Sequence, residues 1–243
     1  MNQNKSIALF DIDKTIYNEH SFFAATKFLI DKGLLPDDTW TKIEQELGKY
    51  TQKIQTYSFT ANNLLKIFVV ALAGKNYDVI MKATKEFFDQ NQANFYPYFK
   101  NILPILKQTH DVYLITTNSQ MVAETVKAGF GLDGYLCTNF EVVDGIFTGE
   151  VLNSLADGKH IVEDLLPKYG GNTMAFGDSE NDIGMLEKVT TPICINPSPE
   201  LLAHATENGW LVTSDSEAEN LILGILKKES ETLWIFAKST KSL

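Results

Sequence analysis

A short apolar run near the start of the chain ends abruptly in acidic residues. Ile7-Ala8-Leu9-Phe10 places four apolar side chains in a row, and Asp11, Asp13 and Thr15 follow directly. A continuous apolar run of this length is typical of a strand buried on both faces, as in the centre of a parallel sheet. In open α/β sheets, ligands bind just outside the carboxyl ends of such strands. The pattern therefore predicts a buried strand with two carboxylates at its functional end.

Residues 17–96 follow a different pattern, in which apolar positions recur at helical spacing without any β-rich run. Four amphipathic helices are expected, and Gly33, Gly48 and Gly74 mark the ends of the first three. This stretch therefore predicts an all-helical insertion. The apolar residues that mark the four helices are Phe22, Phe23, Phe28, Leu29 and Ile30; Trp40, Ile43 and Leu47; Leu64, Leu65, Phe68, Val69 and Leu72; and Val79, Ile80, Ala83, Phe87 and Phe88.

From Pro97 onward, strands and helices alternate, which is typical of an α/β protein. Strands are expected over 111–116, 134–137, 173–176 and 192–195, with a hairpin over 140–151 that turns at Asp144-Gly145. Helices are expected over about 98–108, 119–128, 159–168 and 179–188, and one more α/β unit reaches about residue 226. The fold class predicted is α/β, with a Rossmann-like parallel sheet core formed by residues 1–16 and 97–243 and a helical domain, 17–96, inserted into it. The tail after about residue 227 is left unassigned.

The composition of the chain limits the kinds of partner that it can bind. The 243 residues are 44% hydrophobic and carry a net charge of −10, which argues against nucleic acid or an anionic membrane as a partner. The longest apolar stretch, Leu64 to Ala73, contains Lys66 and is shorter than the roughly 20 residues that span a bilayer. The N-terminus lacks a signal-peptide pattern, and two cysteines are expected to be buried free thiols. A cytoplasmic protein is expected, and its oligomeric state is open.

Polar residues follow three of the predicted strands. The first strand ends in Asp11 and Asp13, the second in Thr116-Thr117-Asn118, and the fourth runs into Gly177-Asp178 with Asp182 four residues later. Because a parallel sheet brings these ends to one edge, acidic groups converge on a small volume and repel one another. Oxygen ligands of this kind suit Mg²⁺. The sequence therefore predicts a magnesium site at this edge.

Two further residues extend this group. Lys159 opens a predicted helix and can supply positive charge, and Thr116 offers a hydroxyl and a backbone N–H. A carboxylate nucleophile, a carboxylate acid/base, Mg²⁺, a lysine and a hydroxyl together are the groups that phosphoryl transfer needs. The leading hypothesis is a phosphatase of small phosphorylated metabolites.

The chain resembles the haloacid dehalogenase superfamily of phosphohydrolases, in the branch (subfamily IB) that includes phosphoserine phosphatase. The likeness covers nearly the whole chain. Asp11-Ile12-Asp13-Lys14-Thr15 matches the first motif of that family, Thr116 the second, Lys159 the third, and the segment from Gly177 to Asp182 the fourth. The helical insertion after the first motif matches the cap domain of that branch.

The resemblance implies a role for each motif residue. Asp11 is expected to be the nucleophile that forms an aspartyl-phosphate, and Asp13 the acid that protonates the leaving alcohol and then activates water. The metal ligands implied are Asp11, the Asp13 carbonyl and Asp178, with Asp182 in support, and the phosphate-binding residues implied are Thr116, Thr117 and Lys159. The cofactor expected is Mg²⁺.

The chain also departs from the family pattern. Lys14 stands where a small residue is common, and Glu19 lies one residue before the position of the glutamate that reads phosphoserine, which His20 occupies. All 21 basic residues are lysines, so no arginine can bind a substrate carboxylate bidentately. Phosphoserine is therefore expected to be a poor substrate. The cap residues expected to line the site are Tyr17, Glu19, His20, Phe22 and Phe23.

Three alternatives remain. The chain could be a phosphoserine phosphatase proper, a phospho-accepting signalling module, or a phosphate binder without catalysis. The helical insertion and Asp13 argue against the signalling module, because a phospho-accepting receiver needs neither a cap nor an acid for a leaving group.

Overall fold

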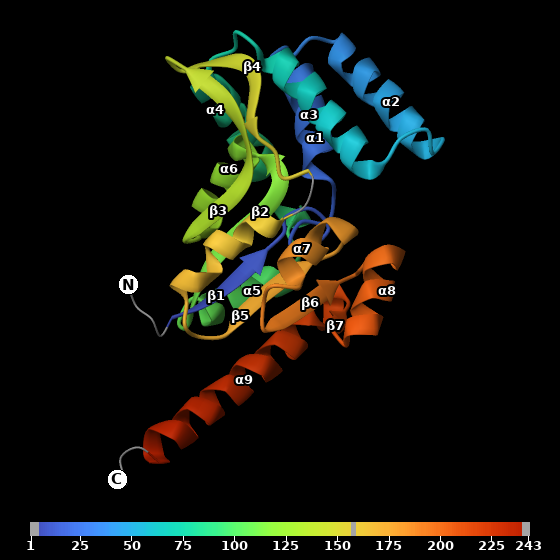
Figure 1. Cartoon of the computed structure of the whole chain (residues 1–243). Coiled ribbons are helices and arrows are strands. Elements are labelled where there is room, and N and C mark those ends of the chain that lie inside the picture. The colour runs from blue at the N-terminus through green and yellow to red at the C-terminus, as the bar shows by residue number, and fades with distance from the viewer. Residues whose placement is uncertain (1–4, 157–158, 240–243) are drawn as a thin grey trace.

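The central sheet is mainly parallel and lies between two layers of helices (Figure 1). A computed structural model of the chain describes residues 5–156 and 159–239, and within them seven strands pair in the order β4-β3-β2-β1-β5-β6-β7. All neighbours are parallel except β3 and β4. The strands are β1 (Ser6–Phe10), β2 (His110–Ser119), β3 (Gly134–Val143), β4 (Ile146–Asn153), β5 (Thr173–Gly177), β6 (Thr191–Ile195) and β7 (Leu211–Thr213).

Strand β1 occupies the middle of the sheet because its apolar run can be buried on both faces. It pairs with β2 on one side and β5 on the other. Ala8 and Phe10 face one layer of the core, and Ile7 and Leu9 face the other, as the two-residue repeat of a strand requires. All four side chains are fully buried. The strand therefore delivers Asp11 to one fixed place at the sheet edge.

Helices cover both faces. The layer over Ala8 and Phe10 contains α5 (Pro97–Leu106), α6 (Gln120–Phe130) and α9 (Asp215–Ser239). The layer over Ile7 and Leu9 contains α7 (Ile183–Leu186) and α8 (Pro199–Asn208), together with short 3₁₀ helices. The 3₁₀ helices of the chain are η1 (Gln92–Asn94), η2 (His160–Asp164), η3 (Leu166–Lys168) and η4 (Glu180–Asp182).

The residues between β1 and η1 form four α-helices, here called the helical segment. They are α1 (Ser21–Asp31), α2 (Asp38–Thr51), α3 (Tyr57–Leu72) and α4 (Tyr77–Gln90). Figure 1 shows this segment beside the β3–β4 hairpin, at the end of the molecule opposite the projecting end of α9. Phe68 and Val69 of α3 pack with Phe140 and Phe147 of the hairpin.

Backbone hydrogen bonds also join the helical segment to the hairpin. The N–H of Gly74 donates to the carbonyl of Phe147 at 2.8 Å, and the N–H of Phe147 donates to that of Lys75 at 3.0 Å. The N–H of Tyr77 donates to the carbonyl of Gly145 at 2.8 Å. The far end of the helical segment is therefore fixed to the sheet through main-chain bonds as well as apolar packing.

The predicted α/β fold with a mostly parallel sheet is confirmed, as is the hairpin. The turn at Asp144-Gly145 has φ values of 50° and 77°, the two positive angles that a two-residue hairpin turn needs. The third strand, expected over 134–137, continues to Val143 and forms one arm of that hairpin.

Other predictions of local structure were wrong. The helix expected over 159–168 is replaced by η2 and η3, because Pro167 cannot donate a backbone hydrogen bond and its ring clashes with the preceding turn of an α-helix. The helix expected to end near Gly48 continues to Thr51. No structure was predicted for the tail after about residue 227, and there α9 continues as far as Ser239.

Both cysteines, Cys137 and Cys194, are buried free thiols, as expected. Within the described ranges, the helices are too short or too polar for any of them to span a bilayer.

Candidate active site

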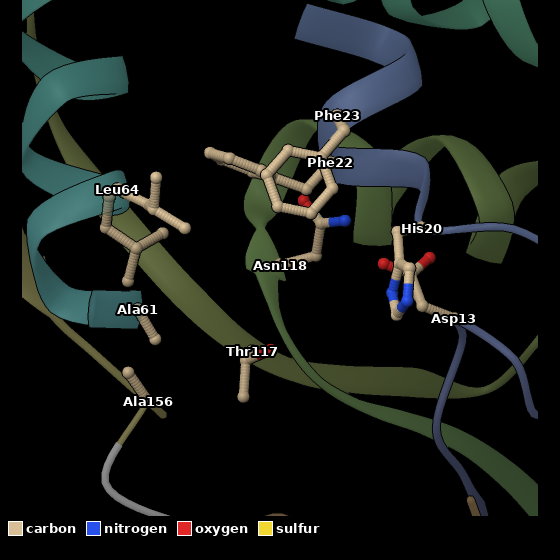
Figure 2. A pocket seen from close by; sticks show the side chains of 10 residues that line it. Asp13, His20, Phe22, Phe23, Ala61, Leu64, Thr117, Asn118 and Ala156 are labelled. Carbon is tan, nitrogen blue, oxygen red and sulfur yellow. The ribbon is translucent and has the colours of Figure 1, made fainter. Parts of the chain in front are cut away.

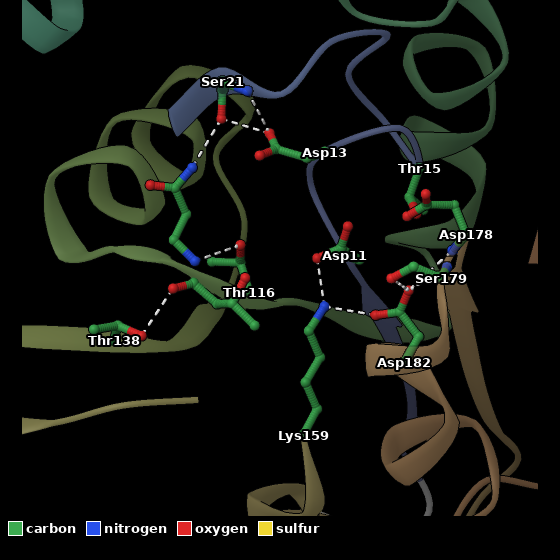
Figure 3. A network of polar contacts seen from close by, with 12 residues as sticks. Asp11, Asp13, Thr15, Ser21, Thr116, Thr138, Lys159, Asp178, Ser179 and Asp182 are labelled. Atoms are coloured by element: carbon green, nitrogen blue, oxygen red, sulfur yellow. Dashed lines mark hydrogen bonds and ion pairs between the residues drawn. The ribbon is translucent and has the colours of Figure 1, made fainter. Parts of the chain in front are cut away.

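Three carboxylates meet at the carboxyl edge of the sheet. Asp11 follows β1, Asp178 follows β5, and Asp182 is the last residue of η4. One oxygen from each lies within 4.8 Å of the other two, and Figure 3 shows the three side chains converging. Asp11 and Asp182 are buried, and Asp178 is partly buried. Parallel pairing of β1 with β5 therefore brings together residues that are far apart in sequence.

Lys159 lies inside this cluster. Its side chain is 1% exposed, and its Nζ donates to Oδ1 of Asp11 and, at 2.6 Å, to Oδ1 of Asp182 (Figure 3). One ammonium thus faces three carboxylates. Because buried charges of one sign are costly, the site has an excess of negative charge that a further cation would relieve.

The pKa values of these side chains reflect the same excess of negative charge. Burial, reinforced by Asp182 and Asp13 and opposed by Lys159, raises the pKa of Asp11 to about 7. Burial and the neighbouring charges of Asp182 and Asp11 raise the pKa of Asp178 to about 9. Burial opposes the charge of Lys159, yet Asp11 and Asp182 hold the pKa of Lys159 above its ordinary value. Carboxylate oxygens clustered in this way fit Mg²⁺, a hard cation that prefers oxygen ligands.

Asp182 is held rigidly beneath the cluster. Its Oδ2 accepts hydrogen bonds from the backbone N–H groups of Asp178, at 2.9 Å, and Ser179, at 3.0 Å. Gly177 makes this approach feasible, because a Cβ at that position would lie 2.4 Å from the Cβ of Asp182. The spacing Gly177-Asp178-Ser179-x-x-Asp182 thus builds a capping box in which Asp182 can still reach Lys159.

The turn after β1 carries the remaining residues of the first motif. Lys14 adopts a left-handed conformation with φ of 61°, and its N–H donates to the carbonyl of Tyr17 at 2.6 Å. This turn directs Thr15 back toward the site, where its hydroxyl donates to Oδ1 of Asp178 at 3.3 Å. The hydroxyl of Tyr98, on α5, donates to the Thr15 carbonyl at 2.5 Å and so holds the turn in place.

Asp13 points toward the helical segment and not toward Lys159 (Figure 3). Its Oδ1 accepts hydrogen bonds from the N–H of Ser21 at 3.0 Å and from the hydroxyl of Ser21 at 2.5 Å. The Nδ2 of Asn118 in turn donates to that hydroxyl at 2.9 Å. Burial raises the pKa of Asp13, while the two bonds from Ser21 oppose that change.

A cavity of ≈ 120 Å³ opens over the cluster and is called the acidic cavity here. Thr116, whose hydroxyl accepts the backbone N–H of Asn118 at 3.1 Å, forms part of its wall. The cavity is large enough for a phosphate group and the oxygens around it. Its lining residues are Asp11, Asp13, His20, Thr116, Thr117, Lys159, Asp178, Ser179 and Asn181.

A second cavity, of ≈ 100 Å³, lies between the start of α1, the side of α3 and the end of β2 (Figure 2). It is called the apolar cavity here. Three of its residues, Asp13, His20 and Thr117, also line the acidic cavity, so the two adjoin. Its other lining residues are Phe22, Phe23, Ala61, Leu64, Leu65, Asn118 and Ala156.

Most residues predicted for the site lie together. Asp11, Asp13, Thr116, Thr117, Lys159, Asp178 and the cap residue His20 line the acidic cavity, and Asp182 contacts it through Lys159. Phe22 and Phe23 line the apolar cavity.

Two predicted residues are not at the site. Tyr17 is fully buried between Phe88 and Phe95, and its hydroxyl accepts a hydrogen bond from Asn94 at 3.3 Å. Glu19 is exposed and lines neither cavity. Of the three predicted residues from Tyr17 to His20, the link from β1 to α1 turns His20 toward the site and places Tyr17 in the core.

Other site residues were not predicted. Ser21 carried no signal beyond its place at the start of a helix, where serine is common. Asn118 belonged to the polar end of the second strand, and Ser179 and Asn181 to the fourth motif, so their positions, though not their contacts, were visible in the sequence. Apolar residues of α3 and Ala156 looked like ordinary core.

Comparison with protein families supports the motif analysis. A family model described as haloacid dehalogenase-like hydrolase matches residues 8–187. A second model with the same description matches residues 158–221.

Relatives carry phosphatase names. A histidinol-phosphatase of Neisseria meningitidis serogroup C is 29% identical over an alignment of 224 residues, which covers 86% of this chain and 98% of that protein. A phosphoserine phosphatase of Methanocaldococcus jannaschii is 25% identical over 208 residues, 83% of this chain and 90% of that one. Phosphoserine phosphatase SerB1 of Mycobacterium tuberculosis is 40% identical over 105 residues, 41% of this chain but 34% of that longer protein.

Solved structures share the fold. A protein with unknown function from Bordetella pertussis Tohama I superimposes with a TM-score of 0.71 at 23% identity, covering 87% of this chain and 99% of that one. A phospho-aspartyl intermediate analogue of phosphoserine phosphatase gives a TM-score of 0.59 at 18% identity, covering 83% of this chain and 91% of that one.

Proposed function

Because this chain belongs to the haloacid dehalogenase-like hydrolases and is a phosphoric monoester hydrolase, we propose that it is a Mg²⁺-dependent phosphatase that works through an aspartyl-phosphate on Asp11. The observation that carries this proposal is the placement of two carboxylates on one short turn. Asp11 contacts Lys159 in the acidic cavity, whereas Asp13 is turned by Ser21 toward the boundary with the apolar cavity. One is positioned to attack phosphorus and the other to reach the leaving group.

In the first step, an oxygen of Asp11 forms a bond to phosphorus while the bond from phosphorus to the substrate's alcohol oxygen breaks. Protonated Asp13 gives its proton to that alcohol oxygen, so the product leaves as a neutral alcohol. Lys159 and the hydroxyl of Thr116 bind the phosphoryl oxygens, on which negative charge is concentrated.

In the second step, Asp13 acts as the base. It takes a proton from a water molecule whose oxygen attacks phosphorus, and the bond between phosphorus and Asp11 breaks. Inorganic phosphate and the free Asp11 carboxylate result, and Asp13 is protonated again for the next cycle. The same side chain therefore serves as the acid in the first step and as the base in the second.

The residues that would hold Mg²⁺ are Asp11, the backbone carbonyl of Asp13 and Asp178, with Asp182 in support. When bound, the metal supplies positive charge to the phosphoryl oxygens and balances the acidic cluster. Asp182 contributes through its contacts with Lys159 and with the N–H of Asp178, which orient both groups.

We also assign the helical residues 17–96 to a cap domain and residues 1–16 and 97–243 to the core. Support comes from the apolar cavity, which has one wall from α1 and α3 and another from β2. A substrate bound with its phosphate in the acidic cavity would place its organic half between the two parts.

For the substrate, we propose a small phosphorylated metabolite. The histidinol-phosphatase and phosphoserine phosphatase relatives make histidinol phosphate and phosphoserine the first compounds to test. Histidinol phosphate is favoured of the two, because the chain has no arginine and the described residues that line the apolar cavity include no lysine to pair with the phosphoserine carboxylate.

The direct experiment measures p-nitrophenyl phosphate hydrolysis by the full chain with Mg²⁺ and with excess EDTA. Turnover that requires Mg²⁺ is expected, together with a covalent phospho-protein that can be trapped by rapid acid quench. Absence of turnover with Mg²⁺ would contradict the phosphatase. Turnover without any trapped phospho-protein in the pre-steady state, or equal rates in EDTA, would contradict the mechanism.

A further inference from the structure

Six of the ten described residues that line the apolar cavity are apolar, and the other four are the polar residues Asp13, His20, Thr117 and Asn118. Phe22 and Phe23 form one side, and Leu64 and Leu65 of α3 form another, as Figure 2 shows for the labelled residues. Ala156 lies opposite, next to Thr117 in the same view. A polar substrate group packed against these apolar side chains would lose its hydration without gaining a hydrogen-bond partner from them. These side chains therefore favour an apolar organic half.

Neighbouring aromatic rings at the apolar cavity are nearly perpendicular to one another. The rings of Phe22 and Phe23 are 5.3 Å apart and nearly perpendicular, and the rings of His20 and Phe23 are 6.1 Å apart at 79°. Phe22 also meets Phe68 edge-on at 5.3 Å. Faces and edges are thus both presented near the cavity, which suits a flat ring in either a stacked or an edge-to-face contact.

The described lining of the apolar cavity offers an anion no ammonium or guanidinium group. Asp13 is its one carboxylate among the described lining residues, and no lysine is among them. Lys159, in the adjoining cavity, is already bound to Asp11 and Asp182. A substrate carboxylate here would be desolvated without a lysine or arginine among the described lining residues to pair with, which is a costly arrangement.

We propose that the organic half of the substrate is an alkyl group bearing a flat ring and no carboxylate. This inference rests on the proposed phosphatase function and adds the substrate class to it. The phosphate binds over Asp11, the alcohol oxygen lies near Asp13, and the ring enters the apolar cavity between α1 and α3.

Two matched pairs of substrates separate the effect of the ring from that of the carboxylate. 2-Phenylethyl phosphate and ethyl phosphate differ in the ring, and O-phosphoethanolamine and O-phosphoserine differ in the carboxylate. With saturating Mg²⁺ and phosphate release as readout, kcat/KM should favour the first member of each pair by at least about tenfold, the scale on which apolar pockets discriminate. A ratio near one, or reversed, in either pair overturns the inference.

Variants locate the effect in the cavity. Phe23→Leu should reduce the ring preference several-fold, whereas the matched control Phe28→Leu, which packs on Phe87 away from the cavity, should not. Ala61→Lys places an ammonium in the partly exposed mouth and should raise kcat/KM for O-phosphoserine relative to O-phosphoethanolamine at least threefold. Val70→Lys, on the exposed face of the same helix, is its control. Ratios unmoved by Phe23→Leu and Ala61→Lys contradict the assignment of the ring to this cavity.

The outcomes also separate this inference from the proposed function. A protein that hydrolyses p-nitrophenyl phosphate and all four alkyl phosphates at similar kcat/KM is a phosphatase without the specificity inferred here. A protein that hydrolyses none of them contradicts the proposed function, and the inference with it.

Discussion

Ser21 donates two hydrogen bonds to one oxygen of Asp13, from its backbone N–H at 3.0 Å and from its hydroxyl at 2.5 Å. Ser21 is the first residue of α1, whereas Asp13 lies on the turn after β1, so the contact joins the helical segment to the sheet. Asn118, near the end of β2, extends the chain of hydrogen bonds through its donation to the Ser21 hydroxyl. The orientation of Asp13 thus depends on the first turn of the helical segment.

Ser21→Ala removes the hydroxyl and leaves the backbone N–H. Because hydrogen bonds to charged groups are worth roughly 1.5–3 kcal/mol, kcat/KM for ethyl phosphate should fall about tenfold or more. The loss should be smaller for p-nitrophenyl phosphate, whose leaving group needs little protonation. Ser21→Thr keeps the hydroxyl and should restore most of the activity. Equal losses on both substrates would show that Ser21 merely supports the fold.

Asp13→Asn tests the acid itself. An amide cannot give a proton to the leaving oxygen, and general acid–base assistance is typically worth about 10²–10⁴ in rate. We expect a loss of this size for alkyl phosphates and a milder loss of aspartyl-phosphate formation with p-nitrophenyl phosphate. The two rates are compared by acid-quench measurement of phospho-protein. A uniform loss across leaving groups would limit Asp13 to a structural or metal-holding role.

Asp178→Ala tests the metal site. Removing one of three clustered carboxylates should raise the Mg²⁺ concentration required for half-maximal activity or abolish activity, and Ca²⁺, which prefers more ligands and looser geometry, should inhibit the unaltered chain. Activity is titrated with Mg²⁺ after removal of metal by EDTA. Asp38→Asn, an exposed acid on α2, is the control. An unchanged Mg²⁺ dependence in Asp178→Ala would exclude Asp178 as a ligand.

His110, at the start of β2, predicts a pH dependence of stability. Burial lowers the pKa of His110 from 6.5 to about 4, so the folded state favours the neutral ring. This contribution to the free energy of unfolding is complete above pH 6.5 and is lost as the pH falls from 6.5 toward 4. Urea unfolding at pH 7.5 and 4.5 should show a smaller loss for His110→Asn than for the unaltered chain.

The pH dependence must be compared between the His110 variant and the unaltered chain, because a second titratable group lies beside His110. Glu229 lies 4.0 Å from Nε2 of His110, and burial raises the pKa of Glu229, which acts in the opposite direction as the pH falls. Glu229 is present in both proteins, and His204→Asn, at a partly exposed histidine, controls for the general effect of losing an imidazole. Identical pH dependence in His110→Asn and the unaltered chain would contradict the assignment.

The sequence predicted the sheet and the acidic cluster well, because both depend on local patterns that a parallel sheet then combines. Apolar runs that end in Asp11, Thr116 and Asp178 mark strands with functional carboxyl ends, and strand pairing alone brings those ends together. The structure also explains why position 177 is a glycine, because the missing Cβ makes room for Asp182.

The parts that sequence analysis missed depend on tertiary contacts. Ser21 contacts Asp13, and Asn118 contacts Ser21, only because the fold brings the start of α1 to the end of β2, which no local pattern records. The apolar cavity joins residues of α1, α3 and the segment near Ala156, each of which looks like core by itself. Tyr17 was misplaced because a short link can turn a side chain inward or outward, and packing against Phe88 and Phe95 decides between them.

The central claim is that Asp11 forms the covalent phospho-intermediate, and Asp11→Asn tests it most directly. The experiment is a pre-steady-state acid quench with ³²P-labelled substrate and Mg²⁺, on the unaltered chain, on Asp11→Asn and on the exposed-acid control Asp38→Asn, all checked for folding by circular dichroism. The account predicts acid-stable label on the unaltered chain and on Asp38→Asn. It predicts none on Asp11→Asn, whose kcat should fall below about one thousandth of the unaltered value, a loss of about 4 kcal/mol in transition-state stabilisation. Label on folded Asp11→Asn, or retention of more than a few per cent of kcat, would contradict it.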